Sequence, residues 1–188
     1  MMTSFERVHP PVLQASSALP LLLVAPEVNG ATIADYAPGQ SLLAAALEAE
    51  FPAVFVIVWR SATAATKDAT LGDSIRAIEA ALDAVGRPVH LAGICQGGWA
   101  AAIVASRRPA QVASLLLIAS AIAFKAGDAV LSELVDAVPQ SVYEAMVAWG
   151  GGVMRGDFLN AGFDALQGWE RLVVGPLRTA NRLDDEAH

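Results

Sequence analysis

Four short apolar runs alternate with stretches of helical periodicity, and this alternation limits the folds open to the chain more than any other feature. The runs lie at residues 19–26, 53–60, 88–94 and 112–120. They are rich in Val, Ile and Leu without polar alternation, as is typical of strands that helices cover on both faces. Strands alternating with helices of these lengths predict a parallel sheet with right-handed crossovers, an α/β fold.

The stretches between the runs carry the signals that begin and end helices. Ser41 stands where it can cap a helix over residues 41–51, and Gly86 closes one over residues 75–86. A third helix is expected at residues 97–107, ended by Pro109. Each of the first three runs is therefore followed by a helix, as strand–helix units require.

The sequence divides into three expected regions. Residues 1–18 form an N-terminal extension, whose charges and prolines do not resemble a secretion signal. Residues 19–124 hold the strand–helix units and form the expected core. Residues 125–188 lack strand-like runs and are broken by Pro139 and by the glycines at 150–152, which indicates a partial helical cap followed by a polar tail.

Composition excludes several functional classes. The net charge is −7 and the twelve Lys and Arg residues are scattered, which argues against nucleic-acid binding. A single cysteine rules out an internal disulfide and a multi-cysteine zinc site, and no ligand-spaced cluster suggests a metal or a bound cofactor. The apolar runs are shorter than the roughly 20 residues of a membrane span, so we expect no transmembrane segment. The single cysteine and the N-terminus that does not resemble a secretion signal indicate a cytoplasmic protein.

The single cysteine, Cys95, lies where the third expected strand meets a helix. Residues 93–97 read Gly-Ile-Cys-Gln-Gly, a nucleophile elbow with Cys in place of Ser. The turn is so tight that small residues must stand two positions before and after the nucleophile. A lone cysteine is also a common core residue, and a short Gly-x-Cys-x-Gly match occurs by chance. Its place between a strand and a helix favours the nucleophile.

An elbow nucleophile needs two N–H donors for the oxyanion that forms during acyl transfer. The residue after the nucleophile supplies one, here the N–H of Gln96. The other comes from an earlier strand-to-helix loop, where Glu27 or Val28 stands, although this loop also reads as an ordinary turn. Glu27, Asn29 and Trp99 are the expected substrate contacts.

In order and spacing, four segments resemble the catalytic core of the polyhydroxyalkanoate synthases and related α/β-hydrolases. They read PLLLVAPEVNGATIADYAPGQSLLAAAL, VFVIVWRSA, IRAIEAALDAVG and VHLAGICQGGWAAAIVA. The resemblance covers residues 19–124 and extends into the expected cap; the cysteine elbow together with the strand ending in Trp59-Arg60 is its most specific part. It implies an acyltransferase in which Cys95 attacks a hydroxyacyl thioester of coenzyme A. The acyl group then passes to the hydroxyl of a growing polyester, and no cofactor stays bound.

The sequence departs from this family where the other catalytic residues belong. In the α/β-hydrolase fold an acid and then a histidine follow the nucleophile on later strands. The histidines here are His9, in the extension, His90, at the far end of the nucleophile strand, and His188, in the polar tail. None matches the family's base, and an unassisted thiol is only a few per cent ionised at pH 7. We therefore expect a truncated or incomplete catalytic unit that lacks the later Asp and His segments.

Two alternatives remain open. The chain is a thiol-dependent ester hydrolase or depolymerase, if the acyl group passes to water. Otherwise it is a non-catalytic module that binds polyester granules or a homologous protein, as its 55% hydrophobic content suggests. Expected partners are a small acyl thioester or polyester, a second copy of the chain, or a complementing C-terminal chain.

Overall fold

The computed structural model describes residues 3–7, 18–28, 30–123, 136, 138–159 and 161. The chain divides into two compact units, residues 1–139 and 140–188. The expected boundary between core and cap lies at residue 124, and the stretch that begins there lies outside the described residues.

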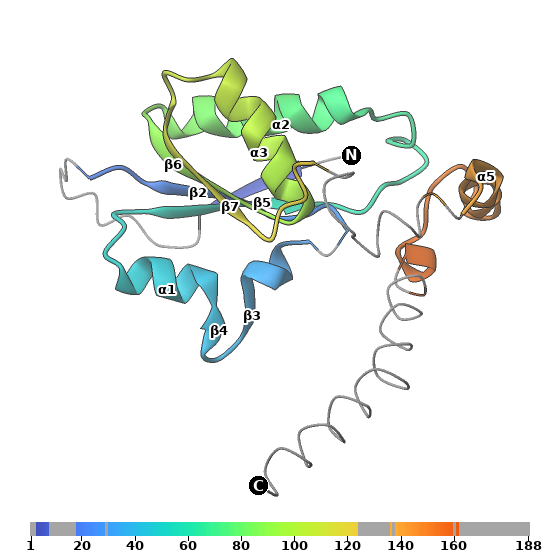
Figure 1. Cartoon of the computed structure of the whole chain (residues 1–188), viewed down its shortest axis with the longest axis horizontal. Helices are drawn as coiled ribbons and strands as arrows, with labels where there is room; N and C mark the ends of the chain where they lie inside the picture. The colour runs from blue at the N-terminus through green and yellow to red at the C-terminus, as the bar shows by residue number, and fades with distance from the viewer. Residues whose placement is uncertain are drawn as a thin grey trace, which may run out of the picture. The chain divides into compact units, whose positions relative to one another are not determined.

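Five strands form the central sheet of the first unit, in the order β1–β5–β2–β6–β7 (Figure 1). Strands β2, β5, β6 and β7 run parallel, so the expected parallel sheet is confirmed. From β2 the chain adds β5 on one side and then β6 on the other. In such sheets ligands bind at the carboxyl ends of the strands, where the order reverses. The bounds are β1 (Thr3–Arg7), β2 (Leu21–Val24), β5 (Val54–Trp59), β6 (Val89–Ile94) and β7 (Val112–Ile118).

Strand β1 was not predicted, because residues 1–18 lack an apolar run. It pairs antiparallel with β5, with Thr3 opposite Trp59 and Arg7 opposite Phe55. An edge strand can form by pairing with the free backbone hydrogen-bonding groups of its neighbour, and the hydrophobic pattern of a sequence does not predict such pairing. The loop after β2 also holds more structure than expected: a short helix, η1 (Ala31–Ala34), and a hairpin of β3 (Asp35–Ala37) and β4 (Gln40–Ser41).

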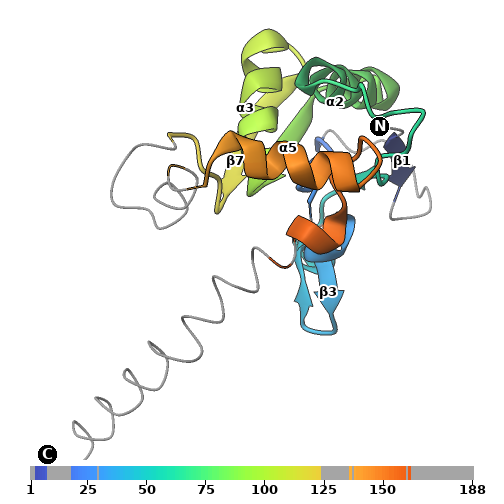
Figure 2. The ribbon, with the colours of Figure 1, turned by 90° about the vertical axis from the view of Figure 1, so that its right-hand side faces the viewer.

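The three expected helices are present as α1 (Leu42–Glu48), α2 (Leu71–Val85) and α3 (Gln96–Arg107). Ser41 caps α1, its hydroxyl accepting from the Ala44 N–H at 2.9 Å, and Gly86 ends α2 in the left-handed conformation at φ 70°. Helices α2 and α3 cover one face of the sheet, while α1 and the hairpin lie on the other (Figures 1 and 2).

Alternate residues of the inner strands supply two apolar cores. In β2, Leu22 and Val24 belong to the cluster with α2 and α3, whereas Leu21 and Leu23 belong to the cluster with α1. Strands β5 and β6 divide their side chains in the same way. The prediction of strands covered on both faces is therefore confirmed for these three.

For β7 the prediction of burial is wrong. All seven residues of this strand are partly or fully exposed, and Leu116 keeps 56% of its surface. The physical reason is position: β7 is the last strand of the described sheet and pairs only with β6. An apolar run identifies a strand, but only the neighbouring elements decide whether its faces are covered.

A buried carboxylate joins α2 to α3. Glu79 accepts a hydrogen bond from Nε of Arg107 at 2.7 Å, and Nε of Arg108 lies 3.6 Å away. The hydrogen bond from Arg107 is the main cause that lowers the pKa of Glu79 below its ordinary 4.5. Because the pKa of Glu79 is lower in the folded state than in the unfolded state, ionised Glu79 stabilises the fold at pH values above 4.5. That stabilisation is lost as the pH falls through the lower pKa of the folded state.

We expect Glu79→Gln to lower stability at pH 7 and to flatten the loss of stability on acidification, since the variant has no carboxylate to protonate. Urea midpoints of both proteins, measured from pH 7 to below 4.5, test this. Two curves that stay parallel throughout would contradict a role for the Glu79 carboxylate.

The second unit contains α5 (Gln140–Trp149), which confirms helical structure after Pro139 in the residues described there. None of the α5 residues is buried, and Trp149 at its end keeps 80% of its surface. Arg155 pairs with Asp157 at 2.7 Å and lies over the ring of Phe158. Across the described residues of both units, no helix is long and apolar enough to span a bilayer.

Candidate active site at the nucleophile elbow

Cys95 occupies a sharp turn between the end of β6 at Ile94 and the start of α3 at Gln96. Its backbone adopts φ 51° and ψ −119°, a region that non-glycine residues rarely enter. Such strain is typical of a nucleophile elbow, which lifts one side chain above the sheet edge. Cys95 is exposed at the N-terminus of α3, where the helix dipole favours negative charge.

Close backbone packing explains the glycines around Cys95. A Cβ at Gly93 would lie 2.5 Å from the Cα of Gly98, closer than real Cβ atoms approach. A Cβ at Gly97 would overlap the carbonyl oxygen of Val24, the last residue of β2. The start of α3 therefore rests directly on the end of β2. This brings the loop after β2 to the elbow, as the oxyanion site requires.

The indole of Trp59 anchors that loop. Its Nε1 donates a buried 2.7 Å hydrogen bond to the carbonyl of Ala25, one residue beyond β2. Because the bond is buried and links the carboxyl ends of β5 and β2, it holds the start of the loop in place. This role for the tryptophan at the end of the second predicted strand was not recognised in the sequence.

The two candidates for the second oxyanion donor differ in their hydrogen bonds. The N–H of Glu27 donates to Oε1 of Gln96 at 3.1 Å, so the side chain after the nucleophile already engages it. Val28 is 37% exposed, and its N–H has no acceptor within the described ranges. The N–H groups in the first turn of a helix have no acceptor within the helix. Because Gln96 is the first residue of α3, its N–H, like that of Val28, can donate to a ligand. Of the two loop candidates, only Val28 thus keeps an N–H without an acceptor in the described ranges.

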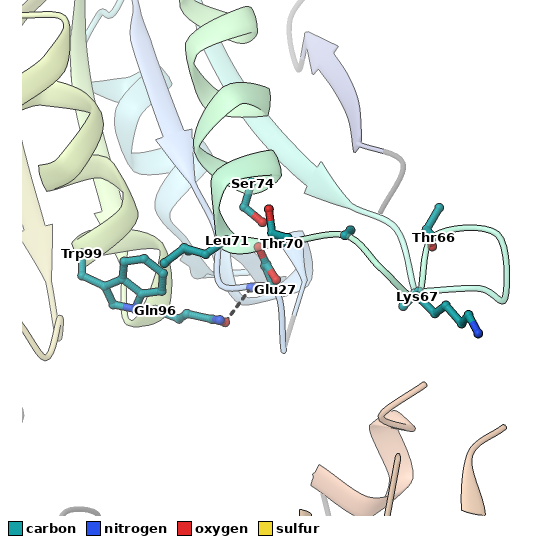
Figure 3. Close-up of a pocket in the computed structure, with 10 residues that line it drawn as sticks. Glu27, Thr66, Lys67, Thr70, Leu71, Ser74, Gln96 and Trp99 are labelled. Atoms are coloured by element: carbon teal, nitrogen blue, oxygen red, sulfur yellow. Dashed lines mark hydrogen bonds between the residues drawn. The ribbon is translucent and has the colours of Figure 1, made fainter. Parts of the chain in front are cut away.

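A pocket of about 290 Å³ lies beside the elbow, with Gln96, the residue after Cys95, in its wall (Figure 3). It brings together Glu27, Gln96 and Trp99, three of the residues singled out in the sequence; Asn29 lies outside the described residues. The loop after β5 and the start of α2 complete the wall, and these were missed. They contribute Ala62, Thr66, Lys67, Ala69, Thr70, Leu71 and Ser74. Their position at the carboxyl end of a parallel strand was the signal that could have revealed them.

One wall of the pocket is held by a capping interaction. The backbone N–H and the hydroxyl of Thr70 both donate to Oδ2 of Asp73 at 2.7 Å. These bonds, the backbone one first, and a further hydrogen bond from Arg76 lower the pKa of Asp73 to about 2. The carboxylate therefore stays ionised at neutral pH and holds Thr70, at the start of α2, in a fixed orientation.

His90 does not approach the elbow. It lies near the amino end of β6, whereas Cys95 follows the carboxyl end of that strand. There its Nδ1 is 2.7 Å from the Ser114 hydroxyl, and its ring contacts the ring of Phe51 edge-on. His9 and His188 lie outside the described residues. In the described part of the chain, no three His, Cys, Asp or Glu residues gather where they could hold a metal ion.

The chain is similar in sequence to two bacterial polymerases. It is 32% identical over 154 residues to the poly(3-hydroxyalkanoate) polymerase subunit PhaC of Cupriavidus necator, which covers 77% of this chain and 26% of the relative. It is 32% identical over 95 residues to poly(3-hydroxyalkanoate) polymerase 1 of Ectopseudomonas oleovorans, covering 48% of this chain and 17% of the relative. The chain thus spans about a quarter or less of the length of these relatives.

The fold also has solved counterparts. An α/β hydrolase enzyme from the metagenome of lagoon sediments at Mar Chica, Morocco, matches 84% of this chain and 60% of its own, with a TM-score of 0.52 and 16% identity. No family model matches the sequence. In sequence the chain is polyhydroxyalkanoate synthase-like, and its fold is that of an α/β-hydrolase.

Proposed function

We propose that Cys95 is the nucleophile of an acyl transfer from hydroxyacyl thioesters of coenzyme A. The observation that carries this is the exposed Cys95 at φ 51°, in a turn that leads from a buried strand into the N-terminus of α3. A cysteine that served only to pack the core would be buried and unstrained. The names of the two relatives, both polymerases of 3-hydroxyalkanoates, support the choice of acyl group.

In the proposed step, Sγ of Cys95 forms a bond to the carbonyl carbon of the thioester. The bond between that carbon and the sulfur of coenzyme A breaks, and the proton of the Cys95 thiol leaves with the coenzyme A thiol. The N–H groups of Gln96 and Val28 stabilise the oxyanion formed on the way, a contribution that is typically among the largest in acyl transfer. In the second step the hydroxyl oxygen of a polyester chain forms a bond to the acyl carbon, the bond from that carbon to Sγ of Cys95 breaks, and the hydroxyl proton returns to the Cys95 sulfur.

The test is the intact mass of the full chain after incubation with 3-hydroxybutyryl-coenzyme A, with Cys95→Ala as the control. We expect one hydroxybutyryl adduct on the wild-type chain and none on the variant.

Adding an acceptor separates transfer from hydrolysis. If the adduct disappears faster with a 3-hydroxybutyrate oligomer than in buffer alone, the chain is a transferase; if the rates are equal, water is the acceptor. An adduct that persists in Cys95→Ala, or no adduct on a chain whose circular dichroism is that of a folded α/β protein, would sink the proposal.

A further inference from the structure

We propose that Ser120 is a positioning residue for Cys95, which it serves by holding the strained turn of the nucleophile from the neighbouring strand. This inference rests on the proposed function for the reaction that Cys95 performs. Ser120 lies two residues beyond the end of β7 and is partly buried. Its role follows from the way in which the ends of β6 and β7 are joined.

Two strained residues lie next to each other where β6 and β7 end. Ile94 and Ile118, the last residues of these strands, are partners in the parallel pairing. The residue after each has a positive φ, 51° at Cys95 and 47° at Ala119, although neither is a glycine. Such backbone persists only where the surrounding structure holds it in place. Both turns therefore need contacts that fix them.

Hydrogen bonds join the two turns. The N–H of Cys95 donates to the carbonyl oxygen of Ile118 at 2.9 Å. The hydroxyl oxygen of Ser120 lies 3.1 Å from that same carbonyl oxygen and 3.3 Å from the carbonyl oxygen of Gly93, and the hydroxyl shares its one proton between them. The backbone is thus bound to the end of β7 on both sides of Ile94, at Gly93 and at Cys95 itself.

The side chain of Ser120 also packs against the first turn of α3. A Cβ at Gly98 would overlap both Oγ and Cβ of Ser120, so the serine occupies the place that a side chain at position 98 would take. Gly98 is bonded in turn to the nucleophile, since its N–H donates to the carbonyl of Cys95 at 3.0 Å. Ser120 therefore contacts the backbone on either side of Cys95, at Gly93 and at Gly98.

The direction of the Gln96 N–H depends on this arrangement. Gln96 lies between Cys95 and Gly98 in the chain, so its N–H is aimed at the oxyanion only while the turn keeps its shape. Misplacing a reacting group by about 1 Å can cost about a hundredfold in rate. Loss of the Ser120 hydroxyl alone should cost less, because the N–H of Cys95 keeps its bond to Ile118.

The first measurement does not depend on the thioester. Ser120→Ala removes the hydroxyl and keeps Cβ, and NMR follows hydrogen exchange of single amides in the full chain. We expect the Cys95 amide to exchange about threefold to tenfold faster than in the wild type, the usual effect of one hydrogen bond, because the turn opens locally more often. The Val89 amide, which donates to the Gln111 carbonyl at the other end of β6, should exchange at an unchanged rate.

The second measurement is the rate of Cys95 acylation as a function of the concentration of 3-hydroxybutyryl-coenzyme A. In Ser120→Ala the maximal rate should fall about threefold to tenfold, while the half-saturating concentration stays unchanged, because Ser120 acts through the backbone of the turn. Ser106→Ala is the matched control: it removes a hydroxyl of α3 that donates to the Ile103 carbonyl at 2.7 Å, and it should alter neither measurement.

Three results would overturn the role of Ser120. They are unchanged exchange of the Cys95 amide, equal acceleration at Cys95 and Val89, which means a general loss of stability, and faster exchange at Cys95 without a slower acylation. If the wild-type chain is not acylated, the proposed function fails, and hydrogen exchange still decides whether Ser120 holds the turn.

Discussion

Gly97→Ala is expected to lower the free energy of unfolding by about 3 kcal/mol or more and to abolish acylation of Cys95. The added methyl would overlap the carbonyl oxygen of Val24 and crowd the carbonyl group of Ala25, which are backbone atoms of the strand end and the residue after it. Backbone cannot move aside as a flexible side chain does, so either α3 shifts away from β2 or the turn at Cys95 opens. Urea unfolding and the intact-mass assay measure the two effects.

Gly72→Ala provides the matched control. Gly72 lies in the first turn of α2, and its added methyl would come 3.3 Å from Nη1 of Arg76, the end of an exposed and flexible side chain. Alanine in a helix reduces the entropy of the unfolded chain, so this variant should be unchanged or stabilised by up to about 1 kcal/mol. Equal losses in Gly97→Ala and Gly72→Ala would show that the close approach of α3 to β2 does not matter.

Leu91→Ala is expected to cost about 2 to 5 kcal/mol of stability. Leu91 lies in β6, between β2 and β7, and keeps only 1% of its surface. Truncating it removes contacts in the core shared with α2 and α3 and leaves a cavity that strands on both sides keep from collapsing. The measurement is the urea midpoint, followed by circular dichroism and by tryptophan fluorescence.

Leu116→Ala tests whether the neighbouring strand differs as the structure indicates. Leu116 has the same chemistry in the adjacent strand β7 but is 56% exposed, so its truncation should cost less than about 1 kcal/mol. A loss as large as that of Leu91→Ala would contradict the exposure of β7, because it would mean that this leucine is covered in solution.

The elements that sequence predicts best are those with a local physical cause. The runs that became β2, β5, β6 and β7 are rich in Val, Ile and Leu and lack polar alternation, which is typical of strands in a parallel sheet. The glycines flanking Cys95 are required by the turn itself, so their spacing revealed the elbow before its strained backbone was seen. Ser41 and Gly86 act within one turn of their helices and were equally readable.

What the sequence determined by itself is the strand–helix order, the helix ends and the placing of Cys95, because each depends on residues a few positions apart. Only the tertiary structure decided that β7 keeps its leucines exposed, since burial depends on neighbouring elements. Only it revealed that Gln96 engages Glu27, 69 positions away, and that the loop after β5 completes the pocket. Such contacts arise where separate strands end at one edge of the sheet, and no pattern local to any of them records the meeting.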